Sequence, residues 1–153
     1  MSDVPEFRAY LSSTIEDLAE ERKAAIEIIR RHALVKDSYR ADEKGTVTTC
    51  TQDVREVHLY VGIIGQRYGW VPDVDDQIDA KSITELEYEA CNETGRPPIP
   101  RLIFIRTTNP DKFTDAHTEP ETAVRIKNFR KRASTEQLAF QFNTIDELRV
   151  ALS

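Results

Sequence analysis

The chain has 153 residues, of which 39% are hydrophobic and 31% charged, and its formal net charge is -6. This balance is typical of one globular domain of about 100–200 residues, and it argues against a general nucleic-acid-binding protein. No apolar run approaches the roughly 18 residues of a membrane span, and the N-terminus lacks the apolar core of a signal peptide. The two cysteines, Cys50 and Cys91, have no metal-ligand spacing. We therefore expect a cytoplasmic domain with reduced thiols, no metal and no membrane or nucleic-acid partner.

The first predicted elements are a strand at residues 7–11 and a helix from about residue 15 to residue 33. Ser12, Ser13 and Thr14 stand between them, where hydroxyls and helix N–H groups bind phosphate or ribose, or cap the helix. Ser13 with Glu16, or Thr14 with Asp17, has the spacing of a capping box. The inward stripe of the helix is predicted to be Ile15, Leu18, Ala19, Ile26, Ile29 and Ala33. Arg22 falls within that stripe, where it reaches a ligand or pairs with an acid such as Glu87.

A short strand at residues 34–39 and a helix at about 47–57 are predicted next. Residues 59–64 form a near-continuous apolar run, which is typical of a parallel strand covered on both faces. The turn that follows contains Gly65, Arg67 and Tyr68. Arg67 and Tyr68 can stack on a base or contact a phosphate. Alternatively, the glycines only make a tight turn with Tyr68 packed beneath it.

A helix is predicted to begin after Ser82 and to stop at Gly95, because both residues favour helix ends. Its apolar stripe consists of Ile83, Leu86, Ala90, Cys91 and Thr94, and its solvated face of Glu85, Glu89 and Asn92. Glu87 lies in the middle of the apolar stripe. A carboxylate pointing inward is costly unless a partner or a cleft receives it. Glu87 is therefore a candidate functional residue or one member of a buried ion pair, whereas Cys91 is expected to be a core thiol.

The remaining predicted elements are strands at 101–106 and 139–142, a helix at about 119–134, and a final helix from Ile145 capped by Thr144. The basic run at residues 125–132 is expected to form the solvated side of an amphipathic helix. Alternating strands and helices of this kind predict a single α/β domain with a mostly parallel five-stranded sheet. Ligands of such sheets bind beyond the carboxyl ends of the strands, where the strand order reverses.

Three stretches, at residues 10–22, 61–69 and 82–90, resemble in the same order an uncharacterised bacterial domain family. Domains of that family commonly precede STAND or NACHT-type signalling NTPases. The family is similar to Toll/interleukin-receptor (TIR) domains and to nucleoside 2-deoxyribosyltransferases. This resemblance implies a three-layer flavodoxin-like fold, and it implies that the chain is one piece of a longer signalling protein. No Walker A motif is present, so an NTPase would lie elsewhere.

The resemblance also implies a site. Ser82-Ile-Thr84-Glu-Leu-Glu87 resembles the glycosidic-site motif of the deoxyribosyltransferases, so Glu87 takes the catalytic position and Thr84 a substrate-binding one. Two departures bear on substrate identity: His58 stands where relatives often carry an acid, and no glycine follows Ser82.

We expect a domain that cleaves the N-glycosidic bond of NAD or another nucleotide through Glu87, without a bound cofactor. The alternative is a non-catalytic module that self-associates or docks a partner.

Overall fold

The computed structural model describes residues 7–14, 18–37, 52–65, 81–92, 97–107 and 120–153. Within these residues, five strands form one parallel sheet in the order β2-β1-β3-β4-β5. The strands are β1 (Arg8–Ser12), β2 (Leu34–Asp37), β3 (Leu59–Ile64), β4 (Arg101–Arg106) and β5 (Ala139–Phe142). The helices are α1 (Ala19–Ile29), α3 (Ile83–Ala90), α4 (Pro120–Glu136) and α5 (Ile145–Leu152). The predicted flavodoxin-like α/β architecture is confirmed.

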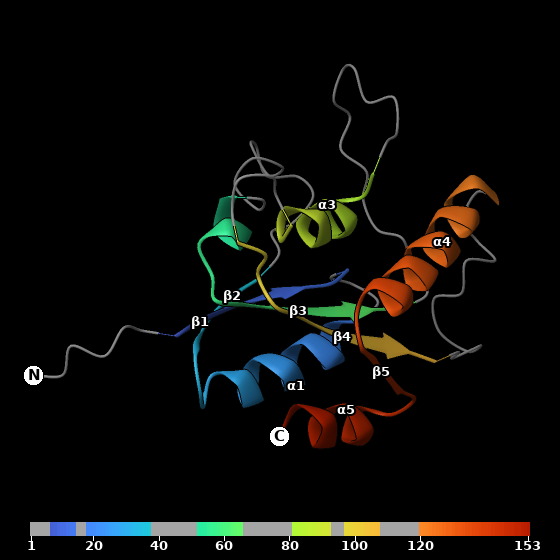
Figure 1. The fold of residues 1–153 in the computed structure, drawn as a ribbon. Helices are drawn as coiled ribbons and strands as arrows, with labels where there is room; N and C mark the ends of the chain where they lie inside the picture. The colour runs from blue at the N-terminus through green and yellow to red at the C-terminus, as the bar shows by residue number, and fades with distance from the viewer. Residues whose placement is uncertain (1–6, 15–17, 38–51, 66–80, 93–96, 108–119) are drawn as a thin grey trace, which may run out of the picture.

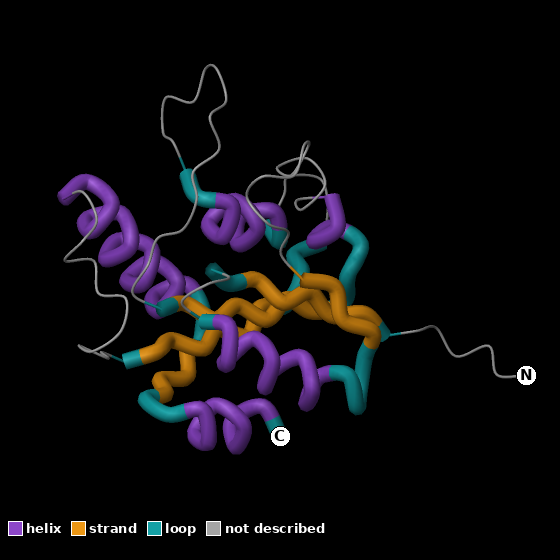
Figure 2. Tube along the Cα trace, turned by 180° about the vertical axis from the view of Figure 1, so that it is seen from behind, coloured by secondary structure: helices purple, strands orange, loops and turns teal. Residues whose placement is uncertain are grey.

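The sheet separates two layers of helices (Figures 1 and 2). α3 and α4 cover one face, and α1 and α5 cover the other. Each face has its own apolar core, because successive side chains of a strand point to opposite sides. On the α3 side the core includes Tyr10, Tyr60, Tyr88, Ile103 and Phe129. On the α1 side it includes Leu11, Leu18, Val61, Phe104 and Leu148.

The order of the strands places the reversal of the sheet between β1 and β3. From β1 the chain first moves outward to β2 and then crosses back to β3, β4 and β5. Parallel neighbours at such a reversal leave a crevice at their carboxyl ends. Ser12 ends β1 and Gly65 follows the last residue of β3, so Ser12 and Gly65 flank this position.

α1 differs from its prediction at its end and in its buried face. The helix ends at Ile29 instead of about residue 33, and Arg30 stands at its C-cap. Ala19 is exposed, although it was predicted to face inward. The buried residues of α1 are Glu21, Arg22, Ala24, Ala25, Ile28 and Ile29. α5 packs beside α1 on the same side of the sheet. The surface of α1 that is buried therefore differs from the stripe that the spacing of its apolar residues predicted.

α3 is shorter than predicted: it ends at Ala90, with Cys91 at its C-cap, instead of running to Gly95. The remaining predicted elements agree with the structure where they are described. β3, β4 and β5 have the predicted bounds, and residues 52–55 are helical within the predicted 47–57 helix, whose first part lies outside the described residues. Thr144 caps α5, since its Oγ1 accepts a hydrogen bond of 3.2 Å from the backbone N–H of Glu147. None of the described helices combines the length and apolar character that a bilayer crossing requires.

Candidate functional site

The site is built around Glu87 on α3. The helix begins as predicted, with the Ser82 hydroxyl accepting a 3.2 Å hydrogen bond from the backbone N–H of Glu85. Glu87 lies one turn into the helix and is 0% exposed. The hydroxyl of Tyr10 donates to its Oε2, and Ser12 Oγ donates to its Oε1 across 2.7 Å. Each carboxylate oxygen therefore has a hydroxyl donor from β1, which offsets part of the cost of burying it.

Tyr10 and Ser12 reach Glu87 because they are two positions apart on the same strand. Side chains two apart lie on one face, and here that face is the one covered by α3. In the register of β1 with β3, Tyr10 stands beside Tyr60 and Ser12 beside Gly62. Glu87 thus sits over the two strands between which the sheet order reverses, as the sequence predicted for a ligand site of this fold.

Tyr60 and Gly62 complete this cluster, and neither was among the predicted site residues. Tyr60 is buried, and burial raises the pKa of its hydroxyl well above the usual value, with further increases from Cys91 and Glu87. A Cβ on Gly62 would lie 2.8 Å from Tyr60 Cε1 and 3.2 Å from its hydroxyl. Gly62 therefore leaves room for the Tyr60 ring. A tyrosine within a predicted buried strand could have identified Tyr60 as a site residue, because a buried hydroxyl usually has a polar partner.

Ser13, Thr14 and Arg22 form a second polar group beside the first, at the carboxyl end of β1. The Arg22 guanidinium is buried and its Nη1 donates to Ser13 Oγ across 2.8 Å. Ser13 Oγ lies 2.9 Å from the carbonyl oxygen of Thr14, to which it donates. The buried Thr14 Oγ1 has no hydrogen-bond partner among the described residues. Buried hydroxyls usually have a hydrogen-bond partner. Thr14 Oγ1 is therefore a candidate for a hydrogen bond with a ligand.

The described contacts of Ser12 and Ser13 join β1 to two helices. The described helix α1 begins at Ala19, and Leu18 occupies its N-cap without a side-chain cap. The proposed capping partners Glu16 and Asp17 lie outside the described residues. Ser12 bonds to Glu87 and Ser13 to Arg22, so these contacts connect the end of β1 to α3 and α1.

The chain also matches a known family along nearly its whole length. A family model described as "Domain of unknown function (DUF4062)" matches residues 8–153. The chain belongs to this family. The DUF4062 match begins at the first residue of β1 and so covers all five strands and their helices. A search of the curated proteins found no match.

Of the other predicted site residues of this DUF4062 chain, Thr84 and Gly65 are described, and both lie near the carboxyl ends of the strands. Thr84 is buried in the first turn of α3, three positions before Glu87 and hence on the same side of the helix. Gly65 follows β3 directly, and its carbonyl oxygen accepts a 2.8 Å hydrogen bond from Arg130 Nη1. Arg67 and Tyr68 lie outside the described residues, as does Gly95, the predicted end of the helix.

The predicted solvated face of α3 is in fact an ion-pair interface with α4. Arg132 Nη1 lies 3.3 Å from Glu85 Oε2 and 3.0 Å from Glu89 Oε2, and Lys81 Nζ lies 2.8 Å from Glu89 Oε2. Burial alone would raise the pKa of Glu89, but hydrogen bonds from Lys81 and Arg132 outweigh burial and lower it. The prediction of an ordinary solvated face was wrong because α4 supplies cations to it.

Tyr88 stabilises the same interface between α3 and α4 from its buried side. Its ring packs edge-on against Phe129, and the guanidinium of Arg101 stands 4.3 Å from the ring centroid. Its hydroxyl donates to Glu136 across 2.7 Å. Ile126 and Phe129 are buried as the amphipathic pattern of α4 predicted. α3 is thereby held on two sides, by β1 through Glu87 and by α4 through Tyr88.

Cys91 is a core thiol, as predicted. It is buried, and its Sγ lies 3.8 Å from the carbonyl oxygen of Glu87. Burial raises the pKa of the thiol to about 12, with Glu87 contributing to the increase and Arg101 opposing it. A thiol held protonated in this way is not a nucleophile.

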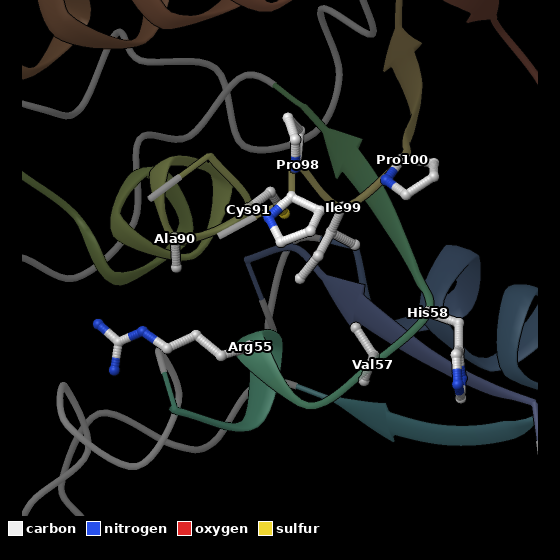
Figure 3. A pocket seen from close by; sticks show the side chains of 9 residues that line it. Arg55, Val57, His58, Ala90, Cys91, Pro98, Ile99 and Pro100 are labelled. Carbon is white, nitrogen blue, oxygen red and sulfur yellow. The ribbon is translucent and has the colours of Figure 1, made fainter. Parts of the chain in front are cut away.

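Two cavities lie elsewhere on the described part of the molecule. One, of about 610 Å³, runs along α1 and is lined by Ala19, Arg22, Lys23, Ile26, Glu27 and Arg30. The other, of about 390 Å³, lies at the amino ends of β3 and β4 (Figure 3). Arg22 connects the first cavity with Ser13, whereas Glu87 lines neither of the two.

Proposed function

We propose that this domain cleaves the N-glycosidic bond of a nucleotide, with Glu87 as the carboxylate beside the ribose. The observation that carries the proposal is a fully buried carboxylate at the reversal of the sheet, with each oxygen bonded to a hydroxyl of β1. The resemblance to TIR domains and nucleoside deoxyribosyltransferases supports the same residue. NAD is the substrate that the TIR resemblance implies, because nicotinamide leaves readily.

The chemistry follows from the charge that develops in the reaction. As the bond from ribose to base breaks, the electron pair leaves with the base and the ribose carbon becomes positive. A carboxylate beside that carbon stabilises the cation or captures it as an ester, and water then completes the hydrolysis. Tyr10 and Ser12 hold the two oxygens of Glu87 in one orientation, which fixes the direction of the carboxylate.

The neighbouring polar group suits the rest of a nucleotide. The Arg22 guanidinium has donors for a phosphate, and the Thr14 and Ser13 hydroxyls can contact phosphate or ribose oxygens. In this proposal Arg67 and Tyr68 contact the base. In this proposal the substrate's glycosidic bond lies between Glu87 on α3 and the group formed by Ser13 and Arg22 at the carboxyl end of β1.

The test is release of nicotinamide from NAD by the purified chain, alone and fused to an oligomerising partner. Glu87→Ala and Glu87→Gln should each lose at least roughly a hundredfold of the activity, as removal of one transition-state contact does. Glu89→Gln, on the opposite side of α3, is the matched control and should keep it. Wild-type turnover that survives in both Glu87 variants would remove Glu87 from the mechanism.

A second candidate is a non-catalytic interaction module of a STAND-type signalling or defence protein. The complete burial of Glu87 favours it, because a carboxylate with both oxygens bonded inside the core can serve as a purely structural connection. In that case neither the free nor the oligomerised chain releases base from NAD or other nucleotides. The Glu87 variants would then change only stability and self-association, which sedimentation measures.

A further inference from the structure

The edge of the described sheet that β5 forms is apolar and accessible. β5 is the last strand on the side away from β2 (Figure 1). Phe140 of this strand is 42% exposed, and Leu138, directly before the strand, is 80% exposed. One step before the first pair of the β4–β5 register, Leu138 stands beside Leu102, which is 38% exposed. An apolar surface therefore reaches the outer edge of the sheet.

These exposed side chains lie on the α1 and α5 side of the sheet. Phe104 and Phe140 are partners in the register, and their rings stack with the centroids 5.6 Å apart and the planes 22° apart. Phe104 belongs to the buried core of that side. Leu138 lies two positions from Phe140 and therefore points to the same side. The core of this side thus continues, through Phe104, into side chains that are open to solvent.

The outward backbone groups of β5 belong to Ala139 and Gln141. The carbonyl oxygen of Phe142 accepts a 2.8 Å hydrogen bond from the backbone N–H of Thr107, which follows β4. Because the backbone groups of successive strand residues alternate in direction, Phe140 also points toward β4, and Ala139 and Gln141 point away from it. Among the described residues, none forms a hydrogen bond to these outward groups. Such an edge is a template for a further strand.

The two edges of the sheet differ in charge. At the other edge, β2 contains Lys36 and Asp37, and Lys36 forms an ion pair with Asp53. Charged side chains on an edge strand oppose pairing with another chain. Residues 137–142, in contrast, include no charged side chain. Two copies of a chain with net charge -6 repel each other, so the uncharged edge is where they approach at the lowest electrostatic cost.

We propose that two copies of this chain associate through β5, antiparallel about a two-fold axis, so that their two five-stranded sheets become one. With the axis beside Phe140, Ala139 of each copy pairs with Gln141 of the other, which gives four backbone hydrogen bonds. The two Phe140 residues then face each other as a non-hydrogen-bonded pair, with their Cα atoms about 4.5 Å apart. The stack of Phe104 on Phe140 thereby continues into the second copy.

The same arrangement explains the other exposed side chain of this edge. Leu138 comes to lie beside Phe142 of the second copy, which covers it. A two-fold contact of this kind is closed, so it produces dimers and not fibres. Glu87 takes no part in this contact, and the proposal does not depend on N-glycosidase activity.

Sedimentation equilibrium of the full chain tests the association. One pair of short strands is a small interface, so we expect a dissociation constant of roughly 10–100 µM. Isotope-filtered NMR on a mixture of labelled and unlabelled chains should show a contact between the Cα hydrogens of Phe140 in the two copies. A chain that stays monomeric well above this range, or contacts between copies at other elements, would overturn the proposal.

Two pairs of variants identify the edge. Gln141→Pro removes an N–H that β5 does not use within its own sheet, and it should weaken the dimer at least roughly tenfold, because two of the four hydrogen bonds are lost. Gln141→Ala keeps that N–H and should dimerise as the wild type does. Phe140→Asp places two carboxylates against each other across the axis and should give a monomer. Leu34→Asp adds the same charge at the β2 edge and should still dimerise.

Circular dichroism shows whether each variant is folded. If Gln141→Pro does not fold, the Phe140 contact and the comparison of Phe140→Asp with Leu34→Asp still decide. A folded Gln141→Pro variant that dimerises as tightly as the wild type would contradict strand pairing at this edge.

Discussion

At the scale of single residues, the stability of the fold depends on the hydrogen bonds of the buried Glu87 carboxylate. Glu87 lies at the centre of a network in which Tyr10 and Ser12 donate, while Tyr60 packs beside them as a protonated phenol. Polar networks inside a core stabilise a structure only when every member has a partner. Removing one donor takes a hydrogen bond from the buried carboxylate of Glu87.

Tyr10→Phe is therefore expected to lower the free energy of unfolding by about 1–3 kcal/mol, the cost of removing a hydrogen bond to a buried charged group. Urea unfolding followed by circular dichroism measures it. Tyr88→Phe is the matched control, because its hydroxyl bonds to Glu136, whose side chain is 43% exposed and can bond to water instead. That variant should lose only about 0.5–1.5 kcal/mol. A Tyr10→Phe variant as stable as the wild type would contradict the network.

At the scale of elements, α3 is held between β1 and α4 by interactions of different kinds. Toward the sheet the contacts are hydrogen bonds to Glu87, and toward α4 they are ion pairs of Arg132 with Glu85 and Glu89. Within α4, Arg132 also pairs with Glu136. Exposed ion pairs are individually weak, but one guanidinium that serves three carboxylates loses less side-chain entropy per contact. We expect Arg132 to set how α3 lies against α4.

This interface makes stability depend on pH. The hydrogen bond from Tyr88 is the main reason that the pKa of Glu136 is lowered, and the pKa of Glu89 is lowered as well. A lowered folded-state pKa stabilises the fold at pH values above the unfolded glutamate pKa of about 4.3, and that stabilisation is lost as the pH falls through the folded pKa. The wild type should therefore lose stability between about pH 5 and pH 3, and Arg132→Gln should lose less over that range.

Thermal unfolding at several pH values and salt concentrations checks this dependence. At neutral pH and low salt, Arg132→Gln should cost about 0.5–1 kcal/mol, and added salt should reduce the difference. Arg149→Gln breaks a single exposed pair with Glu27 and serves as the control, with almost no effect. A loss for Arg132→Gln that is independent of salt would show that its packing on Tyr88, at 5.4 Å from the ring centroid, dominates instead.

At the scale of the whole molecule, the last helix belongs to the core. Leu148 of α5 is fully buried in the cluster shared by α1 and the sheet, whereas Val150, two residues later, is 76% exposed. Two layers of helices on one sheet bury two separate cores, and α5 helps to close the second. Its loss would uncover side chains of β3, β4 and β5.

Leu148→Ala is expected to destabilise the domain by about 2–5 kcal/mol, because it leaves a cavity in a closed core. Val150→Ala changes the same helix at an exposed position and should stay within about 0.5 kcal/mol of the wild type. Denaturant unfolding monitored at the far-UV signal and at Trp70 fluorescence compares the two. If Leu148→Ala behaves like Val150→Ala, α5 does not contribute to the core.

The sequence alone determined the order of strands and helices, the fold class and the direction of Glu87. Continuous apolar runs predicted β3 and β4 with their observed ends, and the spacing of apolar residues in α3 showed that Glu87 points inward. Local periodicity is sufficient for these conclusions because it specifies which face of an element is buried. It also identified Arg22 as an inward-facing charge.

Only the tertiary structure decided the partners. Tyr10 and Ser12 stand 77 and 75 residues before Glu87, and Arg132 stands 47 residues after Glu85. Periodicity states that a face is buried but does not state against what, since the partner depends on strand order and register. The same reason explains why the face of α3 with Glu85 and Glu89 was wrongly predicted to be solvated: α4 reaches it only after the chain has crossed the sheet.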